Sequence, residues 1–232
     1  MLESDFVRHK LLFPLAWLSF AVVLCAQNDT RHQEFVRIAR QGNIDLLFVG
    51  DSITDWFSNP KDGQPAPGLE VWNANFARFK PANFGIAGDT TQGVLWRMQN
   101  GELEGFKARL IVLMLGTNNI GKNPIDEIAE GDRLIIEEFK KRQPQAAVLL
   151  LGIFPRFANP AHPARAVIKQ INSGLEKLAD NRKVFYMDIG DRFTAADGTI
   201  PSDVMADALH PTAKGYQIWA DAIIDEVKRL LK

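Results

Sequence analysis

The chain has 232 residues, of which 46% are hydrophobic and 24% charged, so it can bury a substantial core, and its composition excludes the collagen-like, disordered and disulfide-scaffold classes. With 27 Lys and Arg against 28 Asp and Glu, the net charge of −1 offers no global field for a nucleic acid or an anionic membrane surface. The single cysteine, Cys25, excludes an internal disulfide and a zinc–thiolate site, so function is expected to depend on Ser, His, Asp or Asn.

Residues 1–26 have the pattern of a secretory signal peptide. A basic segment, residues 8–10, precedes the apolar stretch 11–24, and small or polar residues follow it. The apolar stretch is shorter than the roughly 20 residues that a membrane-spanning helix needs. Two alternatives stay open, an uncleaved anchor and lipoprotein processing at Cys25. The prediction is an exported protein, periplasmic or secreted, with one domain over residues 27–232 and no membrane span after processing.

The remaining chain alternates between predicted strands and helices. Strands are expected at residues 46–49, 82–84, 110–115, 146–151 and 184–187, and all except the short second one are continuously apolar, as is typical of strands covered on both faces. The pair Asn123-Pro124 predicts the start of a helix, and Thr212 opens the last one. The Pro- and Gly-rich segment 58–68 is interpreted as a surface loop. This order predicts an α/β fold in three α/β/α layers, with a five-stranded parallel sheet.

Polar residues follow the predicted strands at the edge of the sheet where ligands bind in such folds. Ser52 comes after the first strand, Gly88 after the second and Asn118 after the third. Asp207 and His210 lie on a loop between the fifth strand and the last helix. Four distant stretches of chain are therefore expected to meet at one rim.

These residues supply each group that acyl transfer from an ester requires. Ser52 is the candidate nucleophile, His210 the base, and Asp207, three residues earlier, the acid that orients the imidazole. The N–H groups of Ser52 and Gly88 and the side-chain amide of Asn118 form a candidate oxyanion hole. A glycine suits position 88 because no Cβ blocks a close approach to substrate.

Three further residues are candidate substrate contacts: Asp51, Trp56 and His162. Trp56 could equally pack under the loop that follows it, and His162 could be an ordinary loop histidine. Asp188, at the end of the fifth strand, is the alternative triad acid, but Asp207 is preferred because its spacing to His210 is local.

Three other charged residues receive structural interpretations. His32 is expected on a solvated helix face. Asp89 is expected to cap the helix that follows it, with orientation of the oxyanion turn as the alternative. Arg97 is expected on that same helix, in a core or surface role.

Taken together, these motifs resemble a known enzyme family. Gly50-Asp51-Ser52, Gly88, Gly116-Thr117-Asn118 and Asp207-Ala208-Leu209-His210 resemble, in order and spacing, the four blocks of the GDSL/SGNH hydrolases. The resemblance runs from about Ile44 to the C-terminus. Within the family, stretches 83–91 and 94–104 are most similar to the catalytic subunits of the intracellular platelet-activating-factor acetylhydrolase. The resemblance implies a flavodoxin-like SGNH hydrolase fold, no metal or other cofactor, and ester hydrolysis with a preference for short acyl groups.

The predicted function is a serine esterase for short-chain, acetyl esters, acting as an O-acetyl esterase on a carbohydrate or small-molecule ester. The alternative substrate is a lipid ester resembling platelet-activating factor, although the signal peptide and the loop 58–68 depart from those acetylhydrolase subunits. Two other classes are considered. A metal-dependent phosphoesterase is disfavoured by the absence of Asp-x-His, Asn-His and His-Glu-x-x-His motifs, and an inactive carbohydrate-binding module by the intact catalytic set. The similar subunits pair, which leaves a homodimer open.

Overall fold

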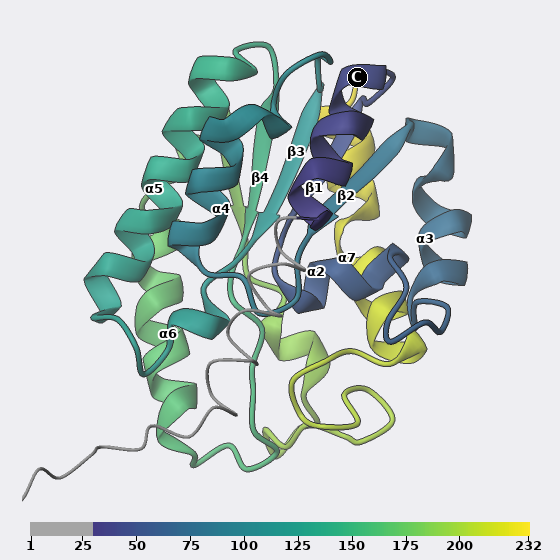
Figure 1. Ribbon diagram of the computed structural model, residues 1–232. Helices are drawn as coiled ribbons and strands as arrows, with labels where there is room; N and C mark the ends of the chain where they lie inside the picture. Colours follow the sequence, from purple (N-terminus) through teal and green to yellow (C-terminus); the bar gives the residue numbers. More distant parts are fainter. Residues whose placement is uncertain (1–29) are drawn as a thin grey trace, which may run out of the picture.

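A computed structural model describes residues 30–232 of the chain (Figure 1). The expected signal peptide, residues 1–26, lies outside the described residues. The first described segment, residues 30–41, is helical. Within residues 30–232, no helix is long and apolar enough to cross a membrane.

Five parallel strands form the centre of the protein. They are β1 (Leu46–Gly50), β2 (Pro81–Gly85), β3 (Leu110–Met114), β4 (Ala147–Leu151) and β5 (Val184–Met187). Their order in the sheet is β2-β1-β3-β4-β5, the flavodoxin-like arrangement, with β1 between β2 and β3. The predicted parallel five-stranded sheet and its α/β class are confirmed, and the predicted strand positions are correct to within one residue at each end.

Helices cover both faces of the sheet, which gives the three predicted layers (Figure 1). The helices are α2 (Ser52–Ser58), α3 (Leu69–Phe76), α4 (Thr91–Arg97), α5 (Ile125–Arg142), α6 (Pro163–Glu176) and α7 (Ala213–Leu230), with short turns η1 (Ala77–Phe79), η2 (Met98–Glu102), η3 (Thr117–Asn119) and η4 (Gly190–Phe193). Residues 30–41, α4, α5 and α6 pack on one face, and α2, α3 and α7 on the other.

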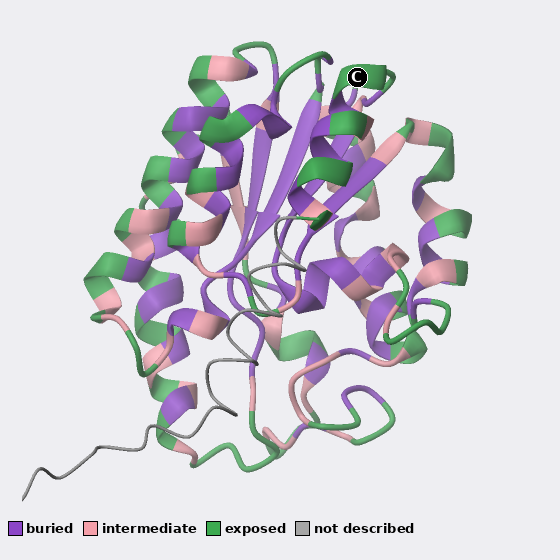
Figure 2. Cartoon of the chain, in the orientation of Figure 1, coloured by how far each residue is buried: buried purple, intermediate pink, exposed green. Residues whose placement is uncertain are grey.

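The strands are buried on both sides because their alternate residues enter different cores (Figure 2). In β1, Leu47 and Val49 join the core under α4 and α5, whereas Leu46 and Phe48 join the core under α7. Both sets of side chains are therefore apolar, which explains why the strand sequence shows no polar alternation.

The last helix begins where the sequence predicts. Thr212 is its N-cap, and its hydroxyl accepts a hydrogen bond from the N–H of Gly215. Tyr216, Trp219 and Ile223 lie on its fully buried stripe. The hydroxyl of Tyr216 donates to the carbonyl of Ile53 in α2 at 2.8 Å, so α7 is bonded directly to the first turn of α2.

Replacing Tyr216 by phenylalanine is expected to lower the free energy of unfolding by about 1 kcal/mol, because one buried hydrogen bond is lost. The aromatic ring, which packs 4.6 Å from the ring of Phe57, is retained. Urea unfolding of both proteins measures the difference. An unchanged unfolding free energy would mean that this bond contributes nothing to holding α7 on α2.

Candidate active site

The candidate nucleophile lies at a tight turn between β1 and α2. Asp51 caps α2 by accepting the N–H of Ile53 at 3.0 Å, and Ser52 is the first residue of the helix. A Cβ at Gly50 would stand 2.2 Å from the hydroxyl of Thr54 and 2.4 Å from the carbonyl of Met114. Only glycine fits this turn, which turns the chain sharply enough to bring Ser52 to the end of the strand.

The candidate base reaches the nucleophile from the other end of the chain. The Oγ of Ser52 lies 3.0 Å from Nε2 of His210, although 158 positions separate the two residues. On the other side of the imidazole, Nδ1 lies 2.6 Å from Oδ2 of Asp207. The second carboxylate oxygen of Asp207 accepts the backbone N–H groups of Leu209 and His210, at 3.0 and 2.7 Å. These bonds fix both the carboxylate and the imidazole that it faces.

The environment of Asp207 favours its ionised form. Partial burial raises the pKa of this carboxyl, but the hydrogen bonds from the side chain and backbone of His210 and from Leu209 outweigh it and hold the pKa below its usual value. The carboxylate therefore stays charged at neutral pH. Since an ionised carboxylate only accepts, Nδ1 must carry the hydrogen, and Nε2 is left free to accept from Ser52.

The candidate oxyanion donors lie just after the ends of neighbouring strands. Gly50 pairs with Gly85 in β2 and with Met114 in β3, so the loops that carry Ser52, Gly88 and Asn118 begin side by side. The backbone of Gly88 has a φ of +82°, and a Cβ there would meet no protein atom within 4 Å. Glycine is thus needed at this position for its backbone conformation rather than for lack of space.

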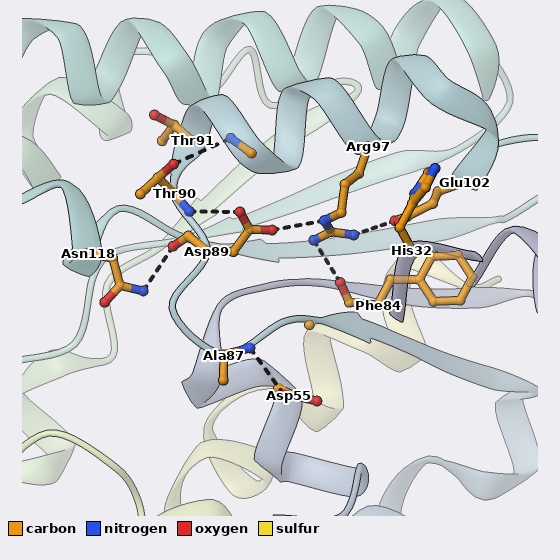
Figure 3. A network of polar contacts seen from close by, with 12 residues as sticks. His32, Asp55, Phe84, Ala87, Asp89, Thr90, Thr91, Arg97, Glu102 and Asn118 are labelled. Atoms are coloured by element: carbon orange, nitrogen blue, oxygen red, sulfur yellow. Dashed lines mark hydrogen bonds and ion pairs between the residues drawn. The ribbon is translucent and has the colours of Figure 1, made fainter. Parts of the chain in front are cut away.

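Asn118 is held in one orientation by the loop that carries Gly88. Its amide nitrogen donates to the carbonyl oxygen of Asp89 at 2.9 Å (Figure 3). An amide nitrogen has two hydrogens, so one remains for a substrate oxygen.

The three expected substrate contacts lie in different settings. Asp51 is fully buried as the cap of α2, beneath the site rather than at its surface. The ring of Trp56 lies 4.3 Å from that of His210, with the ammonium of Lys61 3.9 Å from its centroid. His162 caps α6 and stacks on Phe157. Trp56 is therefore the one of the three that touches a candidate catalytic group.

A hollow of about 490 Å³ opens beside the imidazole. It is lined by Trp56, Lys61, Pro67, Asp207, His210 and Thr212, among others. Lys61 and Pro67 come from the predicted loop 58–68, which the structure shows as a loop from residue 59 onward, with Ser58 ending α2. This loop thus forms one wall of a hollow that the candidate base also lines.

Two carboxyl groups near the site carry unpaired, buried oxygens. Burial raises the pKa of Asp51 to about 7; the N–H of Ile53 opposes this shift, and repulsion from Asp89 adds to it. Burial raises the pKa of Asp132 well above its usual value, and neither of its oxygens has a hydrogen-bond partner among the described residues. The burial of Asp132 could have been predicted from the sequence, because this residue lies four positions after Ile128 on the buried stripe of α5.

These raised values predict that stability falls as pH rises. The folded protein keeps protons that the unfolded chain releases above about pH 4, so for Asp51 alone the free energy of unfolding should fall by up to about 1.4 kcal/mol per pH unit between about pH 4 and 7. Replacing Asp132 by asparagine removes one such group and should flatten the dependence. Urea unfolding at pH 5 and pH 8 measures both slopes. Identical slopes in the two proteins would exclude a raised pKa at Asp132.

A buried network of charged residues extends from the loop that carries Gly88 (Figure 3). The carboxylate of Asp89 accepts from Nε of Arg97 at 2.8 Å, Arg97 bonds Glu102, and Glu102 lies 2.8 Å from Nδ1 of His32. The solvated position predicted for His32 is wrong, because the residue is only 4% exposed. The capping role predicted for Asp89 is also wrong, because Thr90 caps α4 and the Asp89 carboxylate turns to Arg97 instead.

Only part of this network is visible in the sequence. His32 shares a helical stripe with the buried residues Phe35, Val36 and Ala39, at spacings of three, four and seven, and that pattern could have placed it in the core. Glu102 has no such signal, because it lies on the irregular turn η2. Within residues 30–232, no three His, Cys, Asp or Glu side chains are grouped so that they could hold a metal ion.

The sequence is similar to a family profile and to characterised proteins. Residues 48–218 match the profile of the GDSL-like Lipase/Acylhydrolase family. Platelet-activating factor acetylhydrolase IB subunit alpha2 from Rattus norvegicus is 36% identical over 207 residues, which cover 88% of this chain and 84% of the relative.

Two solved structures share the fold. An acetylxylan esterase from Geobacillus stearothermophilus has a TM-score of 0.63 at 21% identity, over 80% of this chain and 94% of that one. A GDSL-like lipase from Bacteroides thetaiotaomicron has a TM-score of 0.64 at 20% identity, over 79% of this chain and 87% of that one. At these identities the two structures bear on the fold alone.

Proposed function

Because this chain belongs to the GDSL-like lipase/acylhydrolase family and is a carboxylic ester hydrolase, we propose that it removes acetyl groups from esters through Ser52, His210 and Asp207. The observation that carries the proposal is the continuous chain of contacts from Ser52 Oγ through the imidazole to the carboxylate, at 3.0 and 2.6 Å. Nucleophile, base and orienting acid stand at the distances that proton transfer requires.

The proposed reaction has two halves. His210 takes the proton of Ser52 as its Oγ attacks the ester carbonyl, and the resulting oxyanion accepts hydrogen bonds from Ser52, Gly88 and Asn118. The imidazolium then gives its proton to the alcohol oxygen, the C–O bond breaks, and an acetyl-serine remains. In the second half, His210 takes a proton from a water molecule whose oxygen attacks the acetyl carbonyl; the imidazolium then returns the proton to Oγ of Ser52 as the Oγ–C bond breaks and acetate leaves. Asp207 stabilises the imidazolium in both halves.

The size of the hollow beside His210 favours an ester substrate whose alcohol portion is compact, about the size of one ring. Since the imidazole protonates the leaving oxygen, the alcohol must lie on the imidazole side of the scissile bond, where the hollow of about 490 Å³ opens. Its walls combine the apolar surfaces of Trp56 and Pro67 with the polar groups of Lys61 and Thr212, a combination suited to a sugar or a small alcohol. We therefore propose an O-acetyl esterase for carbohydrate or small-molecule esters.

The second candidate substrate is an acetylated lipid. The relative from Rattus norvegicus, at 36% identity over most of both chains, is a subunit of a platelet-activating factor acetylhydrolase. This favours a lipid ester, whereas the hollow beside His210 favours a smaller alcohol portion.

A substrate panel separates these candidates. The purified protein is given acetylated xylooligosaccharides, an acetylated ether phospholipid, and p-nitrophenyl esters of two, four and eight carbons, and released acid is quantified. We expect acetate from the sugar esters at higher kcat/KM than from the lipid, and poor turnover of the eight-carbon ester. A preference for the lipid would favour the second candidate, and release of no acid from any ester would contradict the proposed function.

Two further expectations belong to this proposal. We propose that the protein is exported after removal of its N-terminal segment, which mass spectrometry of the protein recovered outside the cytoplasm would test. We also propose a homodimer by similarity to the paired acetylhydrolase subunits, and sedimentation analysis would test it.

A further inference from the structure

The loop of residues 86–90, here called the oxyanion loop, is held at the residues on both sides of Gly88 (Figure 3). Before it, the N–H of Ala87 donates to the carboxylate of Asp55 at 3.2 Å. After it, the carboxylate of Asp89 accepts from Arg97, and the carbonyl of Asp89 accepts from Asn118. Both proposed oxyanion donors outside Ser52 are therefore attached to Asp89, one through the backbone and one through a hydrogen bond.

Arg97 joins the oxyanion loop to the elements that surround it. Its side chain is almost fully buried, and its guanidinium makes three contacts: Nε to Asp89, one terminal nitrogen to Glu102, and the other to the carbonyl of Phe84 at 3.2 Å. Phe84 belongs to β2, the strand that leads into the loop. A planar guanidinium with its donors in a fixed geometry holds three such acceptors at set angles. The loop cannot shift without breaking a charged contact in the interior.

Glu102 and His32 hold the guanidinium of Arg97 on the side away from the oxyanion loop. Glu102 is fully buried, and its second oxygen lies 2.8 Å from Nδ1 of His32. Since the carboxylate only accepts, that nitrogen donates. The ring of Trp96 packs 5.0 Å from the imidazole and covers it. Glu102 is thus held by two donors, and it gives Arg97 one fixed partner on the side away from the loop.

The neighbouring helix leaves room for the Asp89 carboxylate. A Cβ at Gly93 would stand 1.9 Å from Oδ1 of Asp89, closer than any two such atoms can approach. Gly93 has an ordinary helical position in α4, where alanine is normally the more stabilising residue. The absence of a side chain there is explained by the carboxylate that occupies its place.

We propose that Arg97 is a positioning residue for ester hydrolysis: through Asp89 it fixes the Gly88 N–H and the Asn118 amide in the arrangement that receives the oxyanion. The inference rests on the proposed function, since it requires those two donors to act in the reaction. Donors stabilise a developing negative charge best when they need not move as it forms. Arg97 would therefore act on the transition state and leave binding of the uncharged ester unchanged.

The first test replaces Arg97 by lysine, which keeps the charge but cannot hold three acceptors in a planar array. We expect kcat for p-nitrophenyl acetate to fall by about 10- to 100-fold, with KM changed by less than about three-fold. Arg142→Lys is the matched control, because Arg142 also contacts two carboxylates and a carbonyl, those of Glu138, Glu104 and Gln99, but none of these three contacts is with a residue of the oxyanion loop. Its kcat should stay within about two-fold of wild type.

A double-mutant cycle separates positioning from a general loss of structure. If Arg97 acts partly through Asn118, the fold loss in kcat caused by Arg97→Lys must be smaller in an Asn118→Ala background than in the wild type. Equal fold losses in the two backgrounds would overturn the Asn118 branch of the inference.

A second variant disturbs the contact between Asp89 and Arg97 without removing a charge. Gly93→Ala should displace the Asp89 carboxylate and lower kcat in the same direction as Arg97→Lys, even though alanine usually favours a helix. If Arg97→Lys does not fold, Gly93→Ala tests the positioning role in its place. A folded Gly93→Ala protein with wild-type kcat would contradict the inference.

The outcomes distinguish this inference from the proposed function. If Ser52→Ala abolishes hydrolysis while folded Arg97→Lys keeps a kcat within about two-fold of wild type, the positioning role alone is overturned. If Ser52→Ala hydrolyses the ester as fast as the wild type, the proposed function fails, and the role of Arg97 fails with it.

Discussion

Ser52→Ala is expected to lower kcat for p-nitrophenyl acetate by a factor on the order of 10⁴ or more, to the limit of detection. The hydroxyl that His210 contacts at 3.0 Å is the proposed attacking group, and alanine offers no atom to form the acyl-enzyme. Residual turnover would come from the oxyanion donors and from substrate binding alone. Steady-state kinetics measures the loss, and mass spectrometry of the rapidly quenched wild type should detect an added acetyl group that the variant lacks.

The fold of this variant should be intact, because the change removes one oxygen atom from a residue whose backbone stays in α2. Ser58→Ala is the matched control: Ser58 ends the same helix, and its hydroxyl accepts from Asn83 rather than facing His210. Its activity should be close to that of the wild type. If the folded Ser52→Ala protein hydrolyses the ester at the wild-type rate, a residue other than Ser52 must be the nucleophile.

Asp207→Asn is expected to lower kcat by about 10³- to 10⁴-fold with little change in KM. The asparagine can still accept the backbone N–H groups of Leu209 and His210, so the loop should keep its shape. Its amide would face Nδ1 with hydrogens, which favours the imidazole tautomer that carries its proton on Nε2. That tautomer cannot accept the proton of Ser52.

Asp188→Asn is the matched control for this change, since Asp188 is the other acid near the strand ends. The structure pairs it with Asn172 at 3.0 Å and with the N–H of Gly190 at 2.9 Å, and no contact joins it to His210. Its kcat should therefore stay near that of the wild type. A large loss in Asp188→Asn with little loss in Asp207→Asn would reverse the proposed assignment of the acid.

The elements of the fold could be predicted from the sequence because most of the buried strands are continuous apolar runs. In β3, every residue from Leu110 to Met114 is buried, so the pattern in the sequence matches the packing. Gly50, at the end of β1, and Gly88, in the loop after β2, were likewise recognisable from their places at or after the ends of strands. The candidate triad follows from the same logic, since polar residues after parallel strands must meet at one edge.

The buried charges could not be predicted in the same way. Each member of the network from Asp89 to His32 is an ionisable residue that sequence reasoning normally assigns to the surface. Only their mutual pairing makes burial tolerable, and the pairing joins residues up to 70 positions apart. No local spacing rule expresses such a contact, whereas the pair Asp207 and His210, three residues apart, is visible in the sequence.

The bond between Tyr216 and Ile53 also bears on how this chain is made. Ser52 is synthesised before His210 and α7, so the nascent chain carries the proposed nucleophile before it carries the proposed base. In the proposed mechanism, hydrolysis requires His210 beside Ser52, and the hydroxyl of Tyr216 helps to hold α7 against the first turn of α2. If the proposed triad acts, ester turnover by newly synthesised protein reports that α7 has been made and has docked on α2.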